Sequence, residues 1–508
     1  MTARARVTWA VILTLGALAR AVYVARPFDH RIRTSWRQSD YVQIARNFDR
    51  EGMNILYPRI DWRGDTPGYV EAELPIVPWL GACLYRVFGM DERLLRIIPC
   101  AFSVATLFLF AWLAARILPM GGAQFAAAAF ALNPILIYLS TAIQPESVML
   151  FFSVAAFAAI VAWQREQSLP RLLVASVLVG AAILAKTPAA ALGLVLAFAV
   201  FRSQGVRCLA DWRVHLAGWV GILPPLGWYA WTHRFWTQYG NSLGISNESH
   251  FIGADILFPP TFLFGNLKWE TIVAVSPTGW LLILAALGAS FGKVGLVWTW
   301  YGAVWVFYML AARTSGDNWA YYYHCSSVPP ACLLLGVGVS GLWAGLPKLR
   351  NRLALKHQRA VGLALMAGTL LGFVAVTSYL LRLRDNNPEL LALRTCALAL
   401  AEYVPSDGLI VVKGGRMFDE LGRRVAYNEP MVFAWMDRKG FNYGLEEFSL
   451  ETLERIRGRG GRYWLAERSE VERAGLAEEV ARRYRRIADC EGKFQLYDLA
   501  TSPEGPQG

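Results

Sequence analysis

The chain has 508 residues and a formal net charge of +12, and 55% of its residues are hydrophobic while only 17% are charged. Soluble domains carry about 25% charged residues, so this composition excludes an ordinary soluble protein and indicates an integral membrane protein. The basic excess lies mostly beside apolar runs, which favours contact with anionic membrane lipids over binding of nucleic acid.

Apolar runs of about 17–22 residues, long enough to cross the hydrocarbon core of a bilayer, recur along most of the chain. They predict a multi-pass α-helical membrane protein with about eleven spans. The predicted spans are residues 7–24, 96–115, 124–140, 147–163, 172–185, 188–201, 214–231, 277–291, 294–312, 325–346 and 360–381. The first run is interpreted as a retained span, because no small-residue cleavage site follows it. The run 75–88 is too short to span comfortably and is interpreted as a juxtamembrane or re-entrant helix.

Basic and basic-poor loops alternate along the chain, and basic loops favour the cytoplasmic side of a membrane. The basic positions are Arg116, Lys293 and the segments 165–171, 202–213 and 348–359, where Lys348, Arg350, Arg352, Lys356 and Arg359 cluster. This pattern predicts a cytoplasmic N-terminus. The segments predicted to lie outside are 27–95, 141–146, 232–276, 313–324 and everything after residue 381.

The sequence changes character near residue 384. We expect a transmembrane domain over residues 1–383 and a small extracytoplasmic α/β domain over 384–508, about 120 residues. Its predicted strands are 409–412, 463–466 and 494–499, and its predicted helices are 450–457 and 471–486. It has no glycine loop with the spacing of a nucleotide-binding motif, so a structural or acceptor-positioning role is favoured over catalysis. The scattered cysteines do not indicate a zinc site, and a disulfide to Cys490 is expected only if Cys396 is its partner.

The first outer segment, 27–95, is rich in charge and carries two candidate residues, Asp40 and Glu73. A helical pattern after Arg37 would place Arg37 and Asp40 on one face, and Asp40 is expected to have a low to ordinary carboxylate pKa in this polar segment. The arginines at positions 26, 31, 33 and 37 oppose the positive-inside trend. They fit either an anionic substrate headgroup or a basic segment lying on anionic lipid.

A second group of candidates comes from later outer positions. Glu146 follows Pro145 where the third span ends, Lys186 lies between two apolar runs, and Tyr323 and His324 belong to an aromatic run. A carboxylate can take a proton from an acceptor hydroxyl, and a cation can neutralise a phosphate leaving group. Each residue also has a simpler interpretation: a helix-start charge for Glu146, snorkelling for Lys186, and an interfacial aromatic belt for Tyr323. Asp40 likewise fits a solvated loop acid.

These motifs, taken in order, resemble the GT-C superfamily of membrane glycosyltransferases, especially bacterial relatives of protein O-mannosyltransferases and of the lipid A aminoarabinose transferase. The pieces that carry the resemblance are Asp40, the segments 73–80, 93–99 and 131–134, Pro145-Glu146, the segment 184–188, and Tyr322-Tyr323-His324 with the segment 328–330. Two positions depart from the family pattern. Glu146 stands where the family commonly has Asp, and Glu73-Leu74 stands where it has a lysine or histidine before a Pro-Pro pair.

The resemblance implies transfer of a hexose or pentose from a polyprenyl-phosphate donor, with inversion, to a lipid, glycan or protein acceptor at the outer face of a bacterial cytoplasmic membrane. Asp40 would be the base or would orient the acceptor, and Glu146 would assist it. Because Glu73 replaces the family's cation, Lys186 or an arginine such as Arg37 would bind the donor phosphate instead. Tyr323 and His324 would contact substrate. A divalent cation near Asp40 and Glu73 or His324 is compatible with this scheme but not required.

Two other classes compete with the transferase interpretation. A transporter or flippase of polyprenyl-linked or other amphiphilic substrates would typically show inverted repeats and ionisable residues near mid-bilayer, and neither is evident in the sequence. A non-catalytic assembly protein with an outer partner-binding domain is the third class. The sequence does not identify the sugar or the acceptor.

Overall fold

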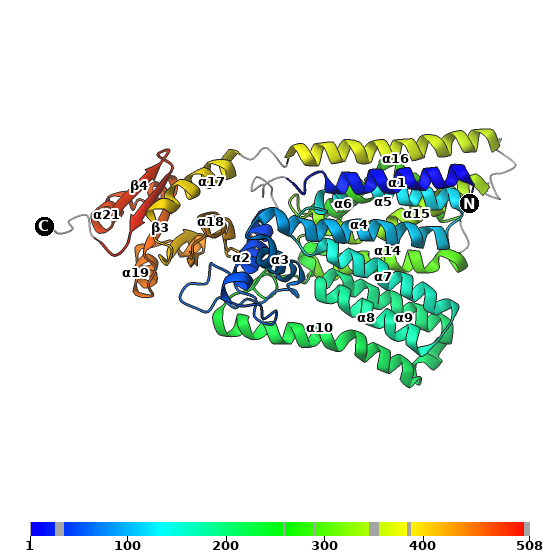
Figure 1. The fold of residues 1–508 in the computed structure, drawn as a ribbon, viewed down its shortest axis with the longest axis horizontal. Coiled ribbons are helices and arrows are strands. Elements are labelled where there is room, and N and C mark those ends of the chain that lie inside the picture. Colours follow the sequence, from blue (N-terminus) through cyan, green and yellow to red (C-terminus); the bar gives the residue numbers. More distant parts are fainter. Residues whose placement is uncertain are drawn as a thin grey trace. The chain divides into compact units, whose positions relative to one another are not determined.

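The computed structural model describes residues 2–25, 35–257, 260–288, 291–344, 355–383 and 388–501. The chain divides into two compact units, each built from three separate segments (Figure 1). We call them the helical unit, made of Met1–Arg26, Arg96–Trp228 and His250–Arg382, and the mixed unit, made of Pro27–Leu95, Tyr229–Ser249 and Leu383–Gly508. The basic residues 26, 31, 33, 348, 350 and 352 lie outside the described residues.

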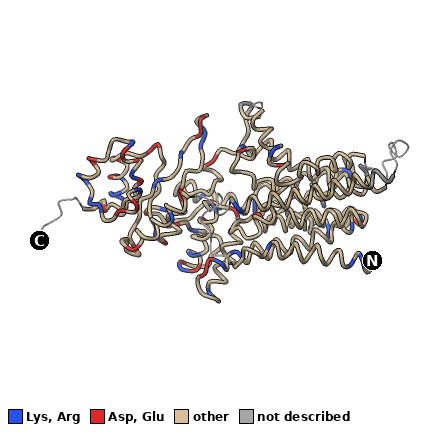
Figure 2. The backbone as a smooth tube through the Cα atoms, turned by 90° about the horizontal axis from the view of Figure 1, so that it is seen from above, with Lys and Arg blue, Asp and Glu red and all other residues tan. Residues whose placement is uncertain are grey.

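The helical unit consists of long apolar helices in which Lys, Arg, Asp and Glu are sparse (Figure 2). Its helices in chain order are α1 (Ala3–Ala21), α4 (Glu92–Ile117), α5 (Met120–Leu132), α6 (Pro134–Leu139), α7 (Glu146–Arg165), α8 (Leu169–Ala185), α9 (Ala191–Gln204), α10 (Trp212–Tyr239), α11 (Ala254–Leu257), α12 (Pro260–Trp269), α13 (Pro277–Ala286), α14 (Phe291–Ala311), α15 (Val328–Ala344) and α16 (Leu355–Leu383). The first turns of α4 and the end of α10 belong to the mixed unit. Short 3-10 segments lie at η1 (Thr187–Ala190), η2 (Gly205–Leu209) and η4 (Tyr321–Ser326), and η3 (Glu270–Val275) is a π-helix.

Among the described residues, five helices are long and apolar enough to cross a membrane, and one bent pair, Pro260–Val275 with Pro277–Ala286, makes up to six. Four shorter apolar helices accompany them: Ile76–Phe88, Met120–Leu132, Leu169–Ala185 and Val328–Trp343. The multi-pass helical architecture predicted from the sequence is therefore confirmed. The number of about eleven spans stays a prediction.

Two features show how the helical unit packs. Helices α5 and α15 approach closely at Gly122 and Gly336, because a Cβ on Gly336 would lie 2.5 Å from the Gly122 carbonyl oxygen. The buried Arg20 of α1 donates to the carbonyl oxygens of Ala131 at 2.7 Å and Phe130 at 2.9 Å. A charge in an apolar interior is tolerated when its donors are satisfied in this way.

The mixed unit is built around a five-stranded sheet with the strand order β2-β1-β3-β5-β4. Strand β1 (Ile410–Lys413) runs parallel to β2 (Gly440–Tyr443) and β3 (Tyr463–Glu467), whereas β5 (Phe494–Asp498) is antiparallel to β3 and to β4 (Arg485–Cys490). The helices of this unit are α2 (Ser35–Glu51), α3 (Ile76–Phe88), α17 (Pro388–Leu400), α18 (Pro430–Met436), α19 (Leu450–Gly458), α20 (Arg468–Arg473) and α21 (Ala477–Arg483), with short 3-10 segments η5 (Ala401–Tyr403) and η6 (Leu445–Glu447). The expected small C-terminal sheet is present.

The sheet carries a hydrophobic core on each face, because successive strand residues point to opposite sides. Val412 and Leu465 pack with Ile44 and Phe48 of α2 in one core, whereas Trp464 belongs to the other core. The single helix expected over 471–486 is instead split into α20 and α21 before β4. Gly475, with φ +67°, separates the two helices, since this backbone region suits glycine.

A disulfide joins Cys396 of α17 to Cys490 of β4. This is the pairing that the sequence left open. It closes a loop with a sequence separation of 94 residues, so it restricts the unfolded chain of the mixed unit considerably.

Candidate functional site

Asp40 lies in the first half of α2 and is completely buried in the mixed unit. Its Oδ1 atom accepts a hydrogen bond of 2.8 Å from the indole nitrogen of Trp62. Its Oδ2 atom is buried without a hydrogen-bond partner among the described residues. A buried carboxylate oxygen with no partner is energetically costly, which marks this position as more than a packing residue.

Burial raises the pKa of Asp40 to about 7, while the charge of Arg37 and the Trp62 hydrogen bond act in the opposite direction. The expectation of an ordinary carboxylate pKa in a polar loop is therefore wrong, because α2 is covered by other parts of the mixed unit. Its helical conformation was predicted correctly, and Arg37 lies one turn before Asp40 as expected. A carboxylate that titrates near neutrality suits proton transfer at physiological pH.

Other acids of the mixed unit lie near enough to Asp40 for their charges to affect its pKa. The charges of Glu73 and Asp61 both raise the pKa of Asp40, and that of Asp40 raises the pKa of Glu429. Burial is the main reason that the pKa of Asp61 rises to about 6 and that of Glu429 to about 7. Glu73 is 6% exposed, and its Oε2 atom is buried without a hydrogen bond among the described residues.

These raised pKa values predict how the stability of the mixed unit depends on pH. In the unfolded chain Asp40 has the ordinary aspartate pKa of 3.8, whereas in the folded chain burial raises its pKa to about 7. Stability is therefore highest below about pH 4 for this group and falls as pH rises through 7, by on the order of a few kcal/mol. Unfolding of wild type and Asp40→Asn between pH 4 and 8 measures this effect. We expect a shallower decline in the variant, and identical slopes would contradict the assignment.

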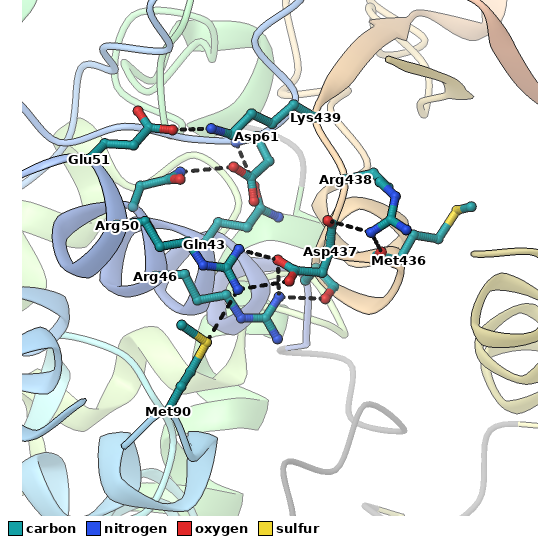
Figure 3. A network of polar contacts seen from close by, with 12 residues as sticks. Gln43, Arg46, Arg50, Glu51, Asp61, Met90, Met436, Asp437, Arg438 and Lys439 are labelled. Atoms are coloured by element: carbon teal, nitrogen blue, oxygen red, sulfur yellow. Dashed lines mark hydrogen bonds and ion pairs between the residues drawn. The ribbon is translucent and has the colours of Figure 1, made fainter. Parts of the chain in front are cut away.

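A network of ion pairs fixes α2 within the mixed unit (Figure 3). Arg50 forms two hydrogen bonds of 2.8 Å with the carboxylate of Asp437, at the end of α18. Arg46 donates to the carbonyl oxygen of Ala434 at 2.8 Å, and Lys439 pairs with Glu51. A bidentate arginine–carboxylate pair such as Arg50 with Asp437 holds a defined geometry. The network thus keeps the helix that carries Asp40 in place.

The helical unit brings together a second set of predicted residues. Glu146, the first residue of α7, is 2% exposed and forms an ion pair with Lys186, which lies between α8 and η1. The Lys186 ammonium also lies over the rings of Tyr322 at 5.2 Å and Tyr323 at 5.7 Å. The Glu146 Oε2 atom is buried without a hydrogen bond among the described residues. A cation backed by a buried carboxylate and two aromatic rings is positioned rather than loosely extended.

His324 follows these tyrosines in η4 but is completely buried. Its Nδ1 atom lies 2.7 Å from the Oε2 atom of Glu270, which also accepts from Ser327 at 2.8 Å. The hydroxyl of Tyr301 donates to the other oxygen of Glu270 at 2.9 Å. His324 is therefore held in a polar cluster inside the helical unit.

Sequence reasoning missed several residues of these sites. Glu270 lies in a segment predicted to be an outer loop, and its only signal is a single acid within a largely apolar stretch. Trp62 and Glu429 carry no motif at all, and Asp61 stands out in the sequence only as one of several acids in the charge-rich first outer segment. They reach the surroundings of Asp40 only through the long-range folding of the mixed unit.

Among the described residues, no group of three or more His, Cys, Asp or Glu side chains is arranged to hold a metal ion. Asp40 and Glu73 belong to one unit and His324 to the other.

Comparison with known proteins agrees with this architecture. A family model described as dolichyl-phosphate-mannose-protein mannosyltransferase matches residues 67–231. No curated protein sequence gives a significant match. The structure is similar to that of ArnT from Cupriavidus metallidurans bound to undecaprenyl phosphate, with a TM-score of 0.63, 16% identity and coverage of 99% of both chains. It is also similar to the archaeal oligosaccharyltransferase AglB from Archaeoglobus fulgidus, in complex with an inhibitory peptide and a dolichol-phosphate, with a TM-score of 0.57, 11% identity, and coverage of 100% of this chain and 75% of that one.

Proposed function

We propose that this chain, a member of the GT-C superfamily of membrane glycosyltransferases, transfers a sugar from a polyprenyl-phosphate donor to an acceptor hydroxyl at the outer face of the cytoplasmic membrane. The observation that carries the proposal is the state of Asp40, a fully buried carboxylate with one unpartnered oxygen and a pKa of about 7. The undecaprenyl phosphate bound to ArnT and the dolichol-phosphate bound to AglB support the donor class.

In the proposed reaction the acceptor oxygen attacks the anomeric carbon of the donor sugar from the face opposite the phosphate. The new glycosidic C–O bond forms while the bond between that carbon and the phosphate oxygen breaks. The acceptor proton passes to the Oδ2 atom of Asp40, and the bonding electrons leave with polyprenyl phosphate. A base with a pKa near 7 is ionised in a large share of the molecules at neutral pH and is still basic enough to take the acceptor proton.

Lys186 is the proposed contact for the donor phosphate. Its ammonium is held by Glu146 and by two tyrosine rings, and a fixed cation stabilises negative charge that grows on a leaving phosphate. Glu146 then acts by positioning Lys186 rather than by taking the acceptor proton. Tyr323 contributes the face of its ring to the same cation.

A donor assay tests the proposed function. Purified protein in detergent receives synthetic polyprenyl-phosphate pentoses and hexoses, and in parallel the corresponding nucleotide sugars. We expect hydrolysis or transfer from at least one lipid-linked sugar and none from the nucleotide sugars, because no nucleotide-binding loop is present in the sequence. Activity with a nucleotide sugar and none with any lipid-linked sugar would overturn the proposal.

A further inference from the structure

A pocket of about 390 Å³ opens in the mixed unit, on the side of Trp62. We call it the aromatic pocket. It is lined by segments from all three parts of this unit, including strand β2 and the end of α10. Its aromatic lining residues are Trp62, Trp236, Tyr239, Phe418, Tyr427 and Phe441. This volume falls within the range typical of small-ligand sites, about 300–1,000 Å³.

The amide side chains in the wall distinguish this pocket from a packing defect. Asn442 donates to the Val412 carbonyl at 3.1 Å and accepts from the Glu429 amide, so it is used by the fold. Asn428 is different: it is 4% exposed, and both its Oδ1 and its Nδ2 are buried without a partner among the described residues. An amide has an acceptor and two donors, and leaving them all unmet in a buried position is unfavourable. Asn428, a residue of the pocket wall, therefore carries a donor and acceptor set that the described fold does not use.

The pocket adjoins the proposed base. Trp62 lines the pocket and donates its indole N–H to Asp40. The backbone of Asn428 is held as well, because its main-chain carbonyl oxygen accepts a hydrogen bond from the indole of Trp36 on α2. A molecule in the pocket thus touches residues that contact Asp40 or its helix.

The lining residues suit a polar sugar headgroup better than a lipid chain. A polyprenyl chain requires a continuous apolar groove, whereas this wall contains arginines at positions 63, 424 and 459 and several amides. Two of these arginines are already paired, Arg63 with Glu51 and Arg459 with Asp65. The wall instead offers aromatic rings and hydrogen-bonding groups. Pyranose rings present apolar C–H faces that pack on aromatic rings and hydroxyl groups that pair with amides.

We infer that the aromatic pocket is a saccharide-binding site that holds the acceptor sugar, with Asn428 hydrogen-bonding its hydroxyl groups. Only the assignment of the bound sugar as the acceptor rests on the proposed function. Saccharide binding itself follows from the pocket. It makes the acceptor a glycan or a sugar-bearing lipid rather than an unglycosylated protein.

Saturation-transfer NMR on the detergent-solubilised full chain tests this inference with a panel of methyl pyranosides as probes. Wild type is expected to transfer saturation to at least one pyranoside. Asn428→Leu removes both polar groups while keeping the volume, so we expect affinity to fall about tenfold or more. Because the amide has no partner, this variant should unfold at the same temperature as wild type or a higher one. Trp236→Ala should also weaken binding, and Asn54→Ala, an amide that does not line the pocket, should leave it unchanged.

The possible results test saccharide binding by the pocket independently of the proposed glycosyltransferase activity. No binding of any pyranoside to wild type, or unchanged binding to Asn428→Leu, overturns the inference even if the donor assay succeeds. Binding that depends on Asn428 supports a saccharide site even if the donor assay fails. Adding polyprenyl-phosphate sugar distinguishes the two sugars of the reaction. We expect the pyranoside signal to persist, whereas competitive loss of the signal would assign the pocket to the donor and overturn the acceptor assignment.

Discussion

Replacing Asp40 with asparagine is expected to lower turnover by about 100-fold or more, the usual scale for loss of a positioned acid or base. The substitution keeps the side-chain volume and can still accept from Trp62, so the mixed unit should fold. Donor binding should be largely retained, because Asp40 is proposed to act on the acceptor. The loss should therefore appear in kcat with little change in the donor KM.

The pH dependence gives this prediction a second readout. Only the ionised form of Asp40 can accept a proton, so wild-type activity should rise with pH through a midpoint of about 7. The residual activity of Asp40→Asn should lack that step. Asp49→Asn is the matched control, because Asp49 lies on the same helix but pairs at 3.7 Å with the exposed Arg86. Near-normal turnover of Asp40→Asn together with an inactive Glu146→Gln would reverse the two roles.

Lys186→Ala is expected to weaken donor binding by about 10- to 100-fold, the scale of a lost charge-assisted hydrogen bond to phosphate. Turnover at saturating donor should fall less than in Asp40→Asn. Lys268→Ala is the matched control, since the Lys268 ammonium also lies over a ring, that of Trp269 at 4.8 Å, but donates to Asn318 at an exposed position. Binding is measured directly with a labelled polyprenyl-phosphate sugar.

Removing Lys186 also leaves Glu146 buried without its partner, which is destabilising by itself. The double variant Glu146→Gln with Lys186→Met removes both charges and separates stability from binding. If the double variant folds well and still binds donor normally, Lys186 is not the phosphate contact. If the double variant folds well but binds donor poorly, the result supports Lys186 as the phosphate contact.

Parts of this architecture were predictable because they depend on local pattern. Apolar runs predicted the helices of the helical unit, and the helical periodicity after Arg37 predicted α2. Glu146 and Lys186 were both singled out individually, and the structure pairs them. Short strand-like runs at 409–412 and 463–466 likewise predicted strands at the positions of β1 and β3.

The burial of Asp40 was not predictable in the same way. It depends on contacts between residues far apart in sequence, such as the hydrogen bond of 2.7 Å from Gln43 of α2 to the Pro430 carbonyl. A polar helix sequence looks solvent-exposed until the segment that covers it is known. Glu270 was missed for a related reason, because its partner His324 lies in a different segment of the helical unit.

A glycosyltransferase breaks the bond between the sugar and the phosphate of its donor, and this cleavage is measured by following both halves of the donor. Protein is reconstituted in liposomes with a polyprenyl-phosphate sugar that carries separate labels on the sugar and on the phosphate. We expect release of one polyprenyl phosphate for each sugar transferred or hydrolysed, with the rate strongly reduced in Asp40→Asn. Movement of intact, doubly labelled donor to the opposite leaflet, with no release of polyprenyl phosphate, would rule out a glycosyltransferase and identify a flippase instead.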